Sequence, residues 1–81
     1  MLSADQRKQL DTAYQSDLRQ ANAVLAKIKG RTLSAAQNDT VSRAQTFMKQ
    51  AAQFHDRDLT SAAEQARRAR LLLQDLAGAL R

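Results

Sequence analysis

The chain has 81 residues, and its 13 Lys and Arg against 8 Asp and Glu give a formal net charge of +5. It contains no cysteine, which excludes disulfides and thiolate metal sites, and no apolar run approaches the roughly 20 residues that cross a bilayer. Proline is absent, glycine occurs twice, and strand-forming residues do not alternate anywhere. We therefore expect one all-helical domain over residues 1–81.

The first predicted helix covers residues 4–29, and both of its ends carry recognisable signals. Ser3 followed by Gln6 fits a capping box, in which two side chains satisfy backbone N–H groups at the helix start. Gly30 stands where a left-handed residue commonly ends a helix, so we expect a positive φ there. Between these ends, apolar residues at intervals of three or four positions mark one helix face. They are Leu10, Tyr14, Leu18, Ala21, Leu25 and Ile28.

The second predicted helix covers residues 35–55 and repeats the same start signal. Ser34 with Gln37 forms a second capping-box pattern after a short loop. The segment from His55 to Arg57 is typical of a tight turn and ends the helix. The apolar face comprises Val41, Ala44, Phe47, Met48, Ala51 and Phe54.

Asp58 is a favourable N-cap for a third predicted helix over residues 59–79. Small residues predominate in the first half of its apolar face and leucines in the second, so the first half can approach a neighbour closely. The face comprises Leu59, Ala62, Ala66, Ala69, Leu73, Leu76 and Leu80. Because the connections are short, consecutive helices should be antiparallel neighbours, which gives a compact antiparallel three-helix bundle.

The three apolar faces together predict the core of this bundle. We expect eight large side chains to be largely buried. They are Leu18, Leu25, Ile28, Phe47, Phe54, Leu59, Leu73 and Leu76. A core of this size should give a modest free energy of unfolding, on the order of 5 kcal/mol.

Residues 44–76 carry a pattern of small and aromatic residues across the last two helices. The earlier helix has Phe47, Ala51 and Phe54 on one face, and the later one has Asp58, Ala62, Ala66 and Ala69. This pattern resembles a single hairpin of the tetratricopeptide (TPR) family. The turn is one residue shorter than is usual there, and Gln74 stands where that family often has proline. The resemblance implies protein binding or scaffolding, because such hairpins stack to present a surface.

Residue types that form enzyme and cofactor sites are sparse. His55 is the only histidine, and Asp56 and Asp58 are too close in sequence to enclose a metal ion with it unaided. We expect His55 to be solvated in the turn or to pack over the end of the bundle. Both glycines are isolated and near helix ends, so no glycine-rich phosphate loop is present. We predict no catalytic residue, no metal, no cofactor and no enzymatic activity.

The positive charge supports the alternative of a small basic protein that binds the phosphate backbone of nucleic acids non-specifically. The charge is spread evenly along the sequence, whereas nucleic-acid binders usually concentrate it on one face. Arg67 and Arg70 are candidate weak phosphate contacts, because their spacing of three residues places both on one side of a helix. The aromatic residues all lie on predicted core faces, which leaves no stacking platform for single strands.

Leu71, Leu72 and Leu73 give the last helix an apolar arc wider than one core face needs. We interpret the excess as a surface for a protein partner or a second copy of the chain. Its candidate residues are Leu71, Leu72, Leu76 and Leu80. We therefore expect a non-catalytic interaction or assembly module, bacterial in style. We expect it to be soluble, in the cytoplasm or the periplasm, and an excised mature domain of a larger protein also fits.

Overall fold

The computed structural model describes residues 1–80, and within them it contains three α-helices and no β-strand. Helix α1 spans Ala4–Ile28, α2 spans Ala35–Phe54 and α3 spans Leu59–Ala79. The molecule measures 44 × 18 × 16 Å, and it is elongated because α1 alone is about 37 Å long at 1.5 Å per residue. The predicted all-α antiparallel three-helix bundle is confirmed, and the helices end within one residue of the predicted positions.

Polar caps hold the helix starts where the sequence predicts them. The hydroxyl of Ser3 accepts a hydrogen bond from the backbone N–H of Gln6 at 3.1 Å, and the Gln6 side chain accepts one from the N–H of Ser3 at 2.8 Å. Ser34 and Gln37 form the same reciprocal pair with the same two distances. At α3, a carboxylate oxygen of Asp58 accepts from a backbone N–H of the first turn at 3.1 Å. Every helix start is therefore fixed by hydrogen bonds that are local in sequence.

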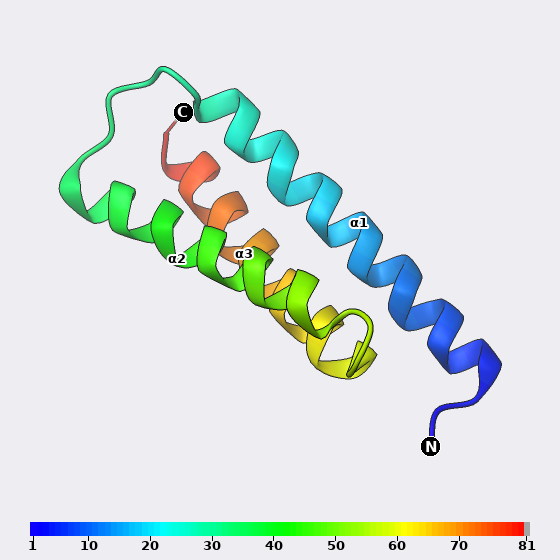
Figure 1. Cartoon of the computed structure of the whole chain (residues 1–81). Coiled ribbons are helices and arrows are strands. Elements are labelled where there is room, and N and C mark those ends of the chain that lie inside the picture. The colour runs from blue at the N-terminus through cyan, green and yellow to red at the C-terminus, as the bar shows by residue number, and fades with distance from the viewer. Residues whose placement is uncertain (81) are drawn as a thin grey trace.

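Gly30 ends α1 in the left-handed conformation, as predicted, with a φ of 83°. The next backbone N–H, that of Arg31, donates to the carbonyl oxygen of Ile28 at 3.0 Å. The Arg31 guanidinium then donates to the carbonyl oxygen of Leu80 at 2.9 Å. The turn at Gly30 thus directs the connection 29–34 toward the end of α3, and in Figure 1 the C-terminal end of the chain lies beside this connection.

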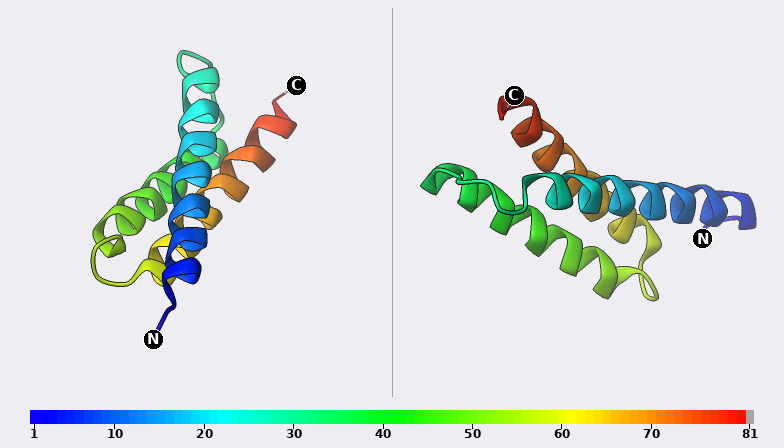
Figure 2. Two further views of the ribbon diagram at one scale, coloured as in Figure 1. Left: turned by 90° about the vertical axis from the view of Figure 1, so that its right-hand side faces the viewer. Right: turned by 90° about the horizontal axis from the view of Figure 1, so that it is seen from above.

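Helix α3 is the packing partner of both other helices. Helices α1 and α2 each contact α3 extensively, whereas they approach each other closely at only a few positions. Figure 1 shows α3 between α1 and α2, and Figure 2 shows the three helices from two further sides. The short connection 29–34 therefore does not make α1 and α2 close neighbours, which differs from the expectation for consecutive helices.

Side-chain size explains this arrangement. Of the residues with no exposed surface, all but Leu73 are alanines: Ala21 in α1, Ala44 and Ala51 in α2, and Ala62, Ala66 and Ala69 in α3. Alanine at a contact lets two helix axes approach closely. Just after α2 ends, His55 reaches α1, where its ring stacks on Tyr14 with the ring centroids 4.4 Å apart. Alanine contacts therefore account for the close approach of α3 to both of its neighbours.

The buried residues form two clusters, one at each end of the bundle. The loop-end cluster consists of Ala21, Val24, Ile28, Ala44, Ala69, Leu73 and Leu76. The turn-end cluster, near the connection between α2 and α3, consists of Tyr14, Ala51, Ala62 and Ala66. The loop-end cluster holds the large buried aliphatic side chains, whereas the turn-end cluster rests on alanines and one tyrosine.

Burial of the large side chains is shallower than the sequence predicts. Of the eight expected in the core, Ile28, Leu73 and Leu76 are buried. The remaining five are only partly buried and pack at the edges of the two clusters: Leu18, Leu25, Phe47, Phe54 and Leu59. Helices that meet on alanine leave too little space between their backbones to enclose these larger groups.

The close approach of α3 predicts that a larger residue at its centre is not tolerated. Ala66→Val should lower the free energy of unfolding by about 1–3 kcal/mol, because the added methyl groups have no space between the helices. Ala52→Val, at an exposed position of α2, is the matched control and should cost only about 0.5 kcal/mol of helix propensity. Urea denaturation measures both variants. Equal costs would contradict the close packing of α3.

The left-handed conformation of Gly30 predicts opposite effects of alanine at the two glycines. A β-carbon at either position has open space around it, so backbone conformation alone decides the outcome. Gly30→Ala should destabilise by about 1 kcal/mol, since L residues are disfavoured at positive φ. Gly78→Ala, inside α3, should instead stabilise by about 0.5–1 kcal/mol. The same denaturation assay tests the pair, and a neutral Gly30→Ala would show that the α1 end does not require this conformation.

Candidate functional site

Most of the leucine surface predicted on α3 belongs to the packing of the domain. Leu76 is 6% exposed and lies in the loop-end cluster, while Leu72 and Leu80 are partly buried against that cluster. Leu71 is 41% exposed because it lies about 200° around the helix from Leu73, on the side away from the core. Leu76 therefore offers little free surface, and the interaction surface on this helix stays a prediction. The wide apolar arc of α3 reflects its contacts with two helices.

Arg70 is engaged inside the domain and does not pair with Arg67 on a free surface. Its Nε lies 2.6 Å from Oδ1 of Asp17 in α1, although the N–H is not aligned for a hydrogen bond, so the contact is a close ion pair. Its Nη1 donates to Oε1 of Gln74 at 2.9 Å, and Gln74 donates to Oε1 of Gln20 at 3.0 Å. Arg67 remains exposed. The charge of Arg70 is therefore already matched by Asp17, and phosphate binding by the two arginines stays a prediction.

Two aromatic side chains of α2 pack at the edges of the core clusters and are not completely covered by any helix. Phe47 and Phe54 are two helical turns apart and both are partly buried. The guanidinium carbon of Arg68 lies 6.0 Å from the ring centroid of Phe47, and that of Arg57 lies 5.8 Å from the centroid of Phe54. Leu72 lies one turn after Arg68 on α3 and is also partly buried. We call these five residues the aromatic face.

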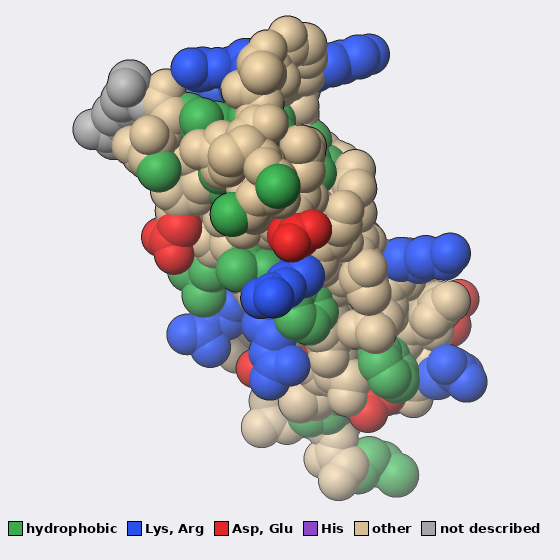
Figure 3. Space-filling model, turned by 90° about the vertical axis from the view of Figure 1, so that its left-hand side faces the viewer, with side chains coloured by type: hydrophobic (Ala, Val, Ile, Leu, Met, Phe, Trp, Pro, Cys, Tyr) green, Lys and Arg blue, Asp and Glu red, His purple; other side chains and the backbone are tan. Residues whose placement is uncertain are grey.

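The arginines of the aromatic face shield its rings without removing them from solvent. Arginine over an aromatic ring is attracted by the ring electrons, a contact worth about 0.5–1 kcal/mol at an exposed site. Figure 3 views the side of the molecule on which α2 lies and shows hydrophobic side chains next to Lys and Arg side chains. The mixture of partly exposed apolar area and flexible cations is typical of protein-binding surfaces.

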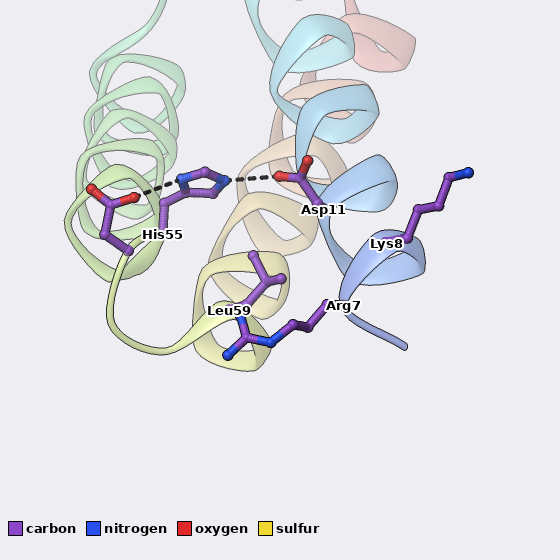
Figure 4. A pocket seen from close by; sticks show the side chains of 6 residues that line it. Arg7, Lys8, Asp11, His55 and Leu59 are labelled. Carbon is purple, nitrogen blue, oxygen red and sulfur yellow. Dashed lines mark hydrogen bonds and ion pairs between the residues drawn. The ribbon is translucent and has the colours of Figure 1, made fainter. Parts of the chain in front are cut away.

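His55 is packed over the turn end of the bundle, one of the two positions expected from the sequence. Its Nε2 lies 2.8 Å from Oδ1 of Asp11 in α1, and its Nδ1 lies 3.3 Å from Oδ1 of Asp56 (Figure 4). The hydrogen bond to Asp11 raises the pKa of His55 above its ordinary value of 6.5, and partial burial opposes this effect. Burial also raises the pKa of the stacked Tyr14. These groups join α1 to the end of α2.

An open polar cavity of about 420 Å³ lies beside this histidine. Its lining comprises Arg7, Lys8, Asp11, His55, Asp56 and Leu59. In Figure 4 the two carboxylates approach opposite nitrogens of the imidazole, so they do not converge on one point where a cation could sit. Among residues 1–80, no group of three or more His, Cys, Asp or Glu side chains is placed to hold a metal ion. The arrangement therefore suits cross-linking of the helices.

Sequence reasoning missed the two acidic residues of α1 that make these cross-links. Asp11 and Asp17 each adjoin the apolar face of α1, next to Leu10 and Leu18. A charged residue at the edge of a buried face usually has a partner on the neighbouring element. The position of Asp11 and Asp17 at the edge of the apolar face was therefore the signal in the sequence that each has a partner on another helix. The identity of the partners, His55 and Arg70, depends on how the helices are arranged in space.

Comparison with protein-family models, with characterised proteins and with solved structures gives no match for this chain. The resemblance of residues 44–76 to a TPR hairpin therefore stays a prediction. None of the helices within residues 1–80 has the length and hydropathy that crossing a bilayer requires.

The engagement of Arg70 predicts a clear difference between the two arginines that the sequence pairs. Arg70→Ala should lower the free energy of unfolding by about 1–3 kcal/mol, because it leaves the largely buried carboxylate of Asp17 without its charged partner. Arg67→Ala should change it by less than about 0.5 kcal/mol, as is usual for exposed sites. Thermal and urea denaturation measure both. If the two variants are equally stable, the ion pair between α1 and α3 contributes nothing.

Proposed function

We propose that the domain is a non-catalytic protein-interaction module that binds through the aromatic face. The observation that carries this proposal is the incomplete burial of Phe47 and Phe54, each of which has an arginine over its ring. Aromatic and arginine side chains supply most of the binding energy in many interfaces. A partner lying on this face would bury both rings and Leu72, with the two guanidinium groups at its rim.

The packing of the domain supports the same function. Its fully buried residues are nearly all alanines, so the large apolar side chains contribute less to the domain's own core than their number suggests. A chain of this length buries only about 60–65% of its unfolded surface, and association is a common way to add burial. The resemblance to a TPR hairpin also favours a scaffolding role.

A second candidate function is non-specific binding to the phosphate backbone of nucleic acids. The observation that favours it is the internal use of acidic side chains: Asp11 and Asp56 pair with His55, Asp17 with Arg70 and Glu64 with Arg68. The exposed Lys and Arg side chains are distributed over all three helices. Such a distribution suits weak electrostatic attraction more than sequence readout.

Self-association is the most direct test of the interaction module, because a second copy of the chain is a defined partner. We expect sedimentation equilibrium at tens of micromolar to detect a dimer. Phe47→Gln should weaken it by about tenfold or more, the effect of losing a central aromatic contact. Ala23→Gln, at an exposed position of α1, is the matched control and should leave it unchanged. Loss of the dimer with Leu71→Glu but not with Phe47→Gln would assign binding to the leucines of α3.

Salt dependence separates the two candidate functions. Binding to a short DNA duplex should weaken steeply as salt rises, because phosphate contacts release counterions, whereas association through apolar groups should not. Fluorescence anisotropy with a labelled duplex at two salt concentrations measures the first, and sedimentation at the same concentrations measures the second. A monomeric wild type that binds duplex at low salt would favour the nucleic-acid function over the interaction module.

A further inference from the structure

We propose that His55 is a pH-sensitive clasp that holds the first half of α1 on the α2–α3 hairpin. The proposal does not depend on which partner the domain binds. The contact joins two helices: His55 directly follows α2, and Asp11 lies in α1, 44 residues earlier. Helices α1 and α2 otherwise approach each other closely at few points. A polar contact here therefore ties two elements that lack extensive packing of their own.

The geometry requires a protonated ring to satisfy both carboxylates. Nε2 lies 2.8 Å from Asp11 and Nδ1 lies 3.3 Å from Asp56. A neutral imidazole has one N–H donor and one lone pair, so one of the two carboxylates would face a lone pair. An imidazolium donates to Asp11 and places a positive charge 3.3 Å from the carboxylate of Asp56, so both contacts become attractive. The clasp is thus complete only in the charged form.

Stacking on Tyr14 couples the ring to the packing beneath it. The two ring planes are 26° apart with centroids at 4.4 Å, and Tyr14 belongs to the turn-end cluster. At the start of the chain Leu2 is partly buried, whereas residues 3–9 are all exposed. The first turns of α1 are therefore attached to the domain mainly through Leu10, Asp11 and Tyr14. Release of His55 would free this segment while leaving the loop-end cluster intact.

Other charged groups around the ring do not reverse this argument. Those lining the cavities beside it are Arg7, Lys8 and Asp11 from α1, Asp56 and Arg57 from the turn, and Asp58 at the start of α3. Asp58 is occupied by the N–H and hydroxyl of Ser61, and these bonds lower its pKa. Arg57 lies over Phe54. Asp11 and Asp56 remain the only charged groups in contact with the ring nitrogens among residues 1–80.

The direction of the pH effect follows from the raised pKa of His55. The folded-state pKa of His55 is higher than the ordinary value of 6.5. The folded chain therefore binds this proton more tightly than the unfolded chain does. The stabilisation is fully present below the ordinary value and is lost as the pH rises through the folded-state pKa. Raising the pH through the folded-state pKa of His55 should therefore weaken the attachment of α1 at the turn end.

The chain supplies its own reporters for the test. It has one histidine and one tyrosine, so the ring signals of His55 and Tyr14 in an NMR spectrum need no separation from others. A titration from about pH 5 to about pH 9 spans the ordinary histidine range. It measures the His55 midpoint, the cross-relaxation between the two rings, and the protection of α1 amides against hydrogen exchange, corrected for intrinsic rates.

We expect a His55 midpoint above 6.5, the ordinary value. As the ring loses its proton, the contact between the rings should weaken. Protection of the amides at residues 10–14 should fall by about fivefold, the size expected for losing one charge-assisted hydrogen bond at a partly exposed site. Amides around Leu73 should not change over the same range. Asp11→Asn should lower the His55 midpoint and remove most of the effect on α1.

His55→Gln is the matched control, because glutamine keeps a hydrogen-bonding side chain that does not titrate. In this variant the protection of α1 amides against hydrogen exchange should be the same at every pH of the titration. Circular dichroism checks that the variant remains helical. A wild-type midpoint at or below the ordinary value would overturn the proposal. So would α1 protection that is independent of pH in the wild type, or a pH dependence that is the same in His55→Gln.

Discussion

Alanine at the helix contacts is the constraint on which the rest of the structure depends. Helix α3 presents Ala62, Ala66 and Ala69 with no exposed surface, and both other helices pack against it. Close backbones gain dispersion contacts along the whole helix, but they exclude large side chains from the space between them. The large apolar groups are consequently displaced to the edges of the contacts. The aromatic face and the shallow burial of Leu18 and Leu25 follow from that displacement.

The parts of the structure that the sequence predicts are those fixed by neighbouring residues. The Ser3 and Ser34 capping boxes, the Asp58 cap and the conformation of Gly30 involve groups three or fewer positions apart, and all are observed. The order of packing could not be predicted in this way. Short connections indicate neighbours, but the sizes of residues on three separate helices decide which pair approaches most closely.

The same distinction explains the outcome at the candidate sites. Arg67 and Arg70 have the spacing of one helix side, yet Arg70 sits where α3 faces α1 and meets Asp17 across the contact. Leu76 was included in both the predicted core and the predicted interaction surface. A helical repeat gives the direction of a side chain but not the number of helices that pack around it. The partners of His55 and Arg70 lie 44 and 53 residues away in sequence, so only the assembled helices identify them.

The two ends of the bundle differ in what holds them together, and this difference bears on how the domain can change shape. The loop end combines Val24, Ile28, Leu73 and Leu76 in one buried cluster, whose removal from water on folding is insensitive to pH. The turn end buries mainly alanines and Tyr14, so polar contacts supply a larger share of its stability. Parts of a protein with little buried apolar area open at lower free energy than the rest. Opening at the turn end would expose Phe54 and Leu59, which pack on that cluster, and Phe54 also belongs to the aromatic face. A change at this end would therefore alter the surface through which we propose that the domain binds.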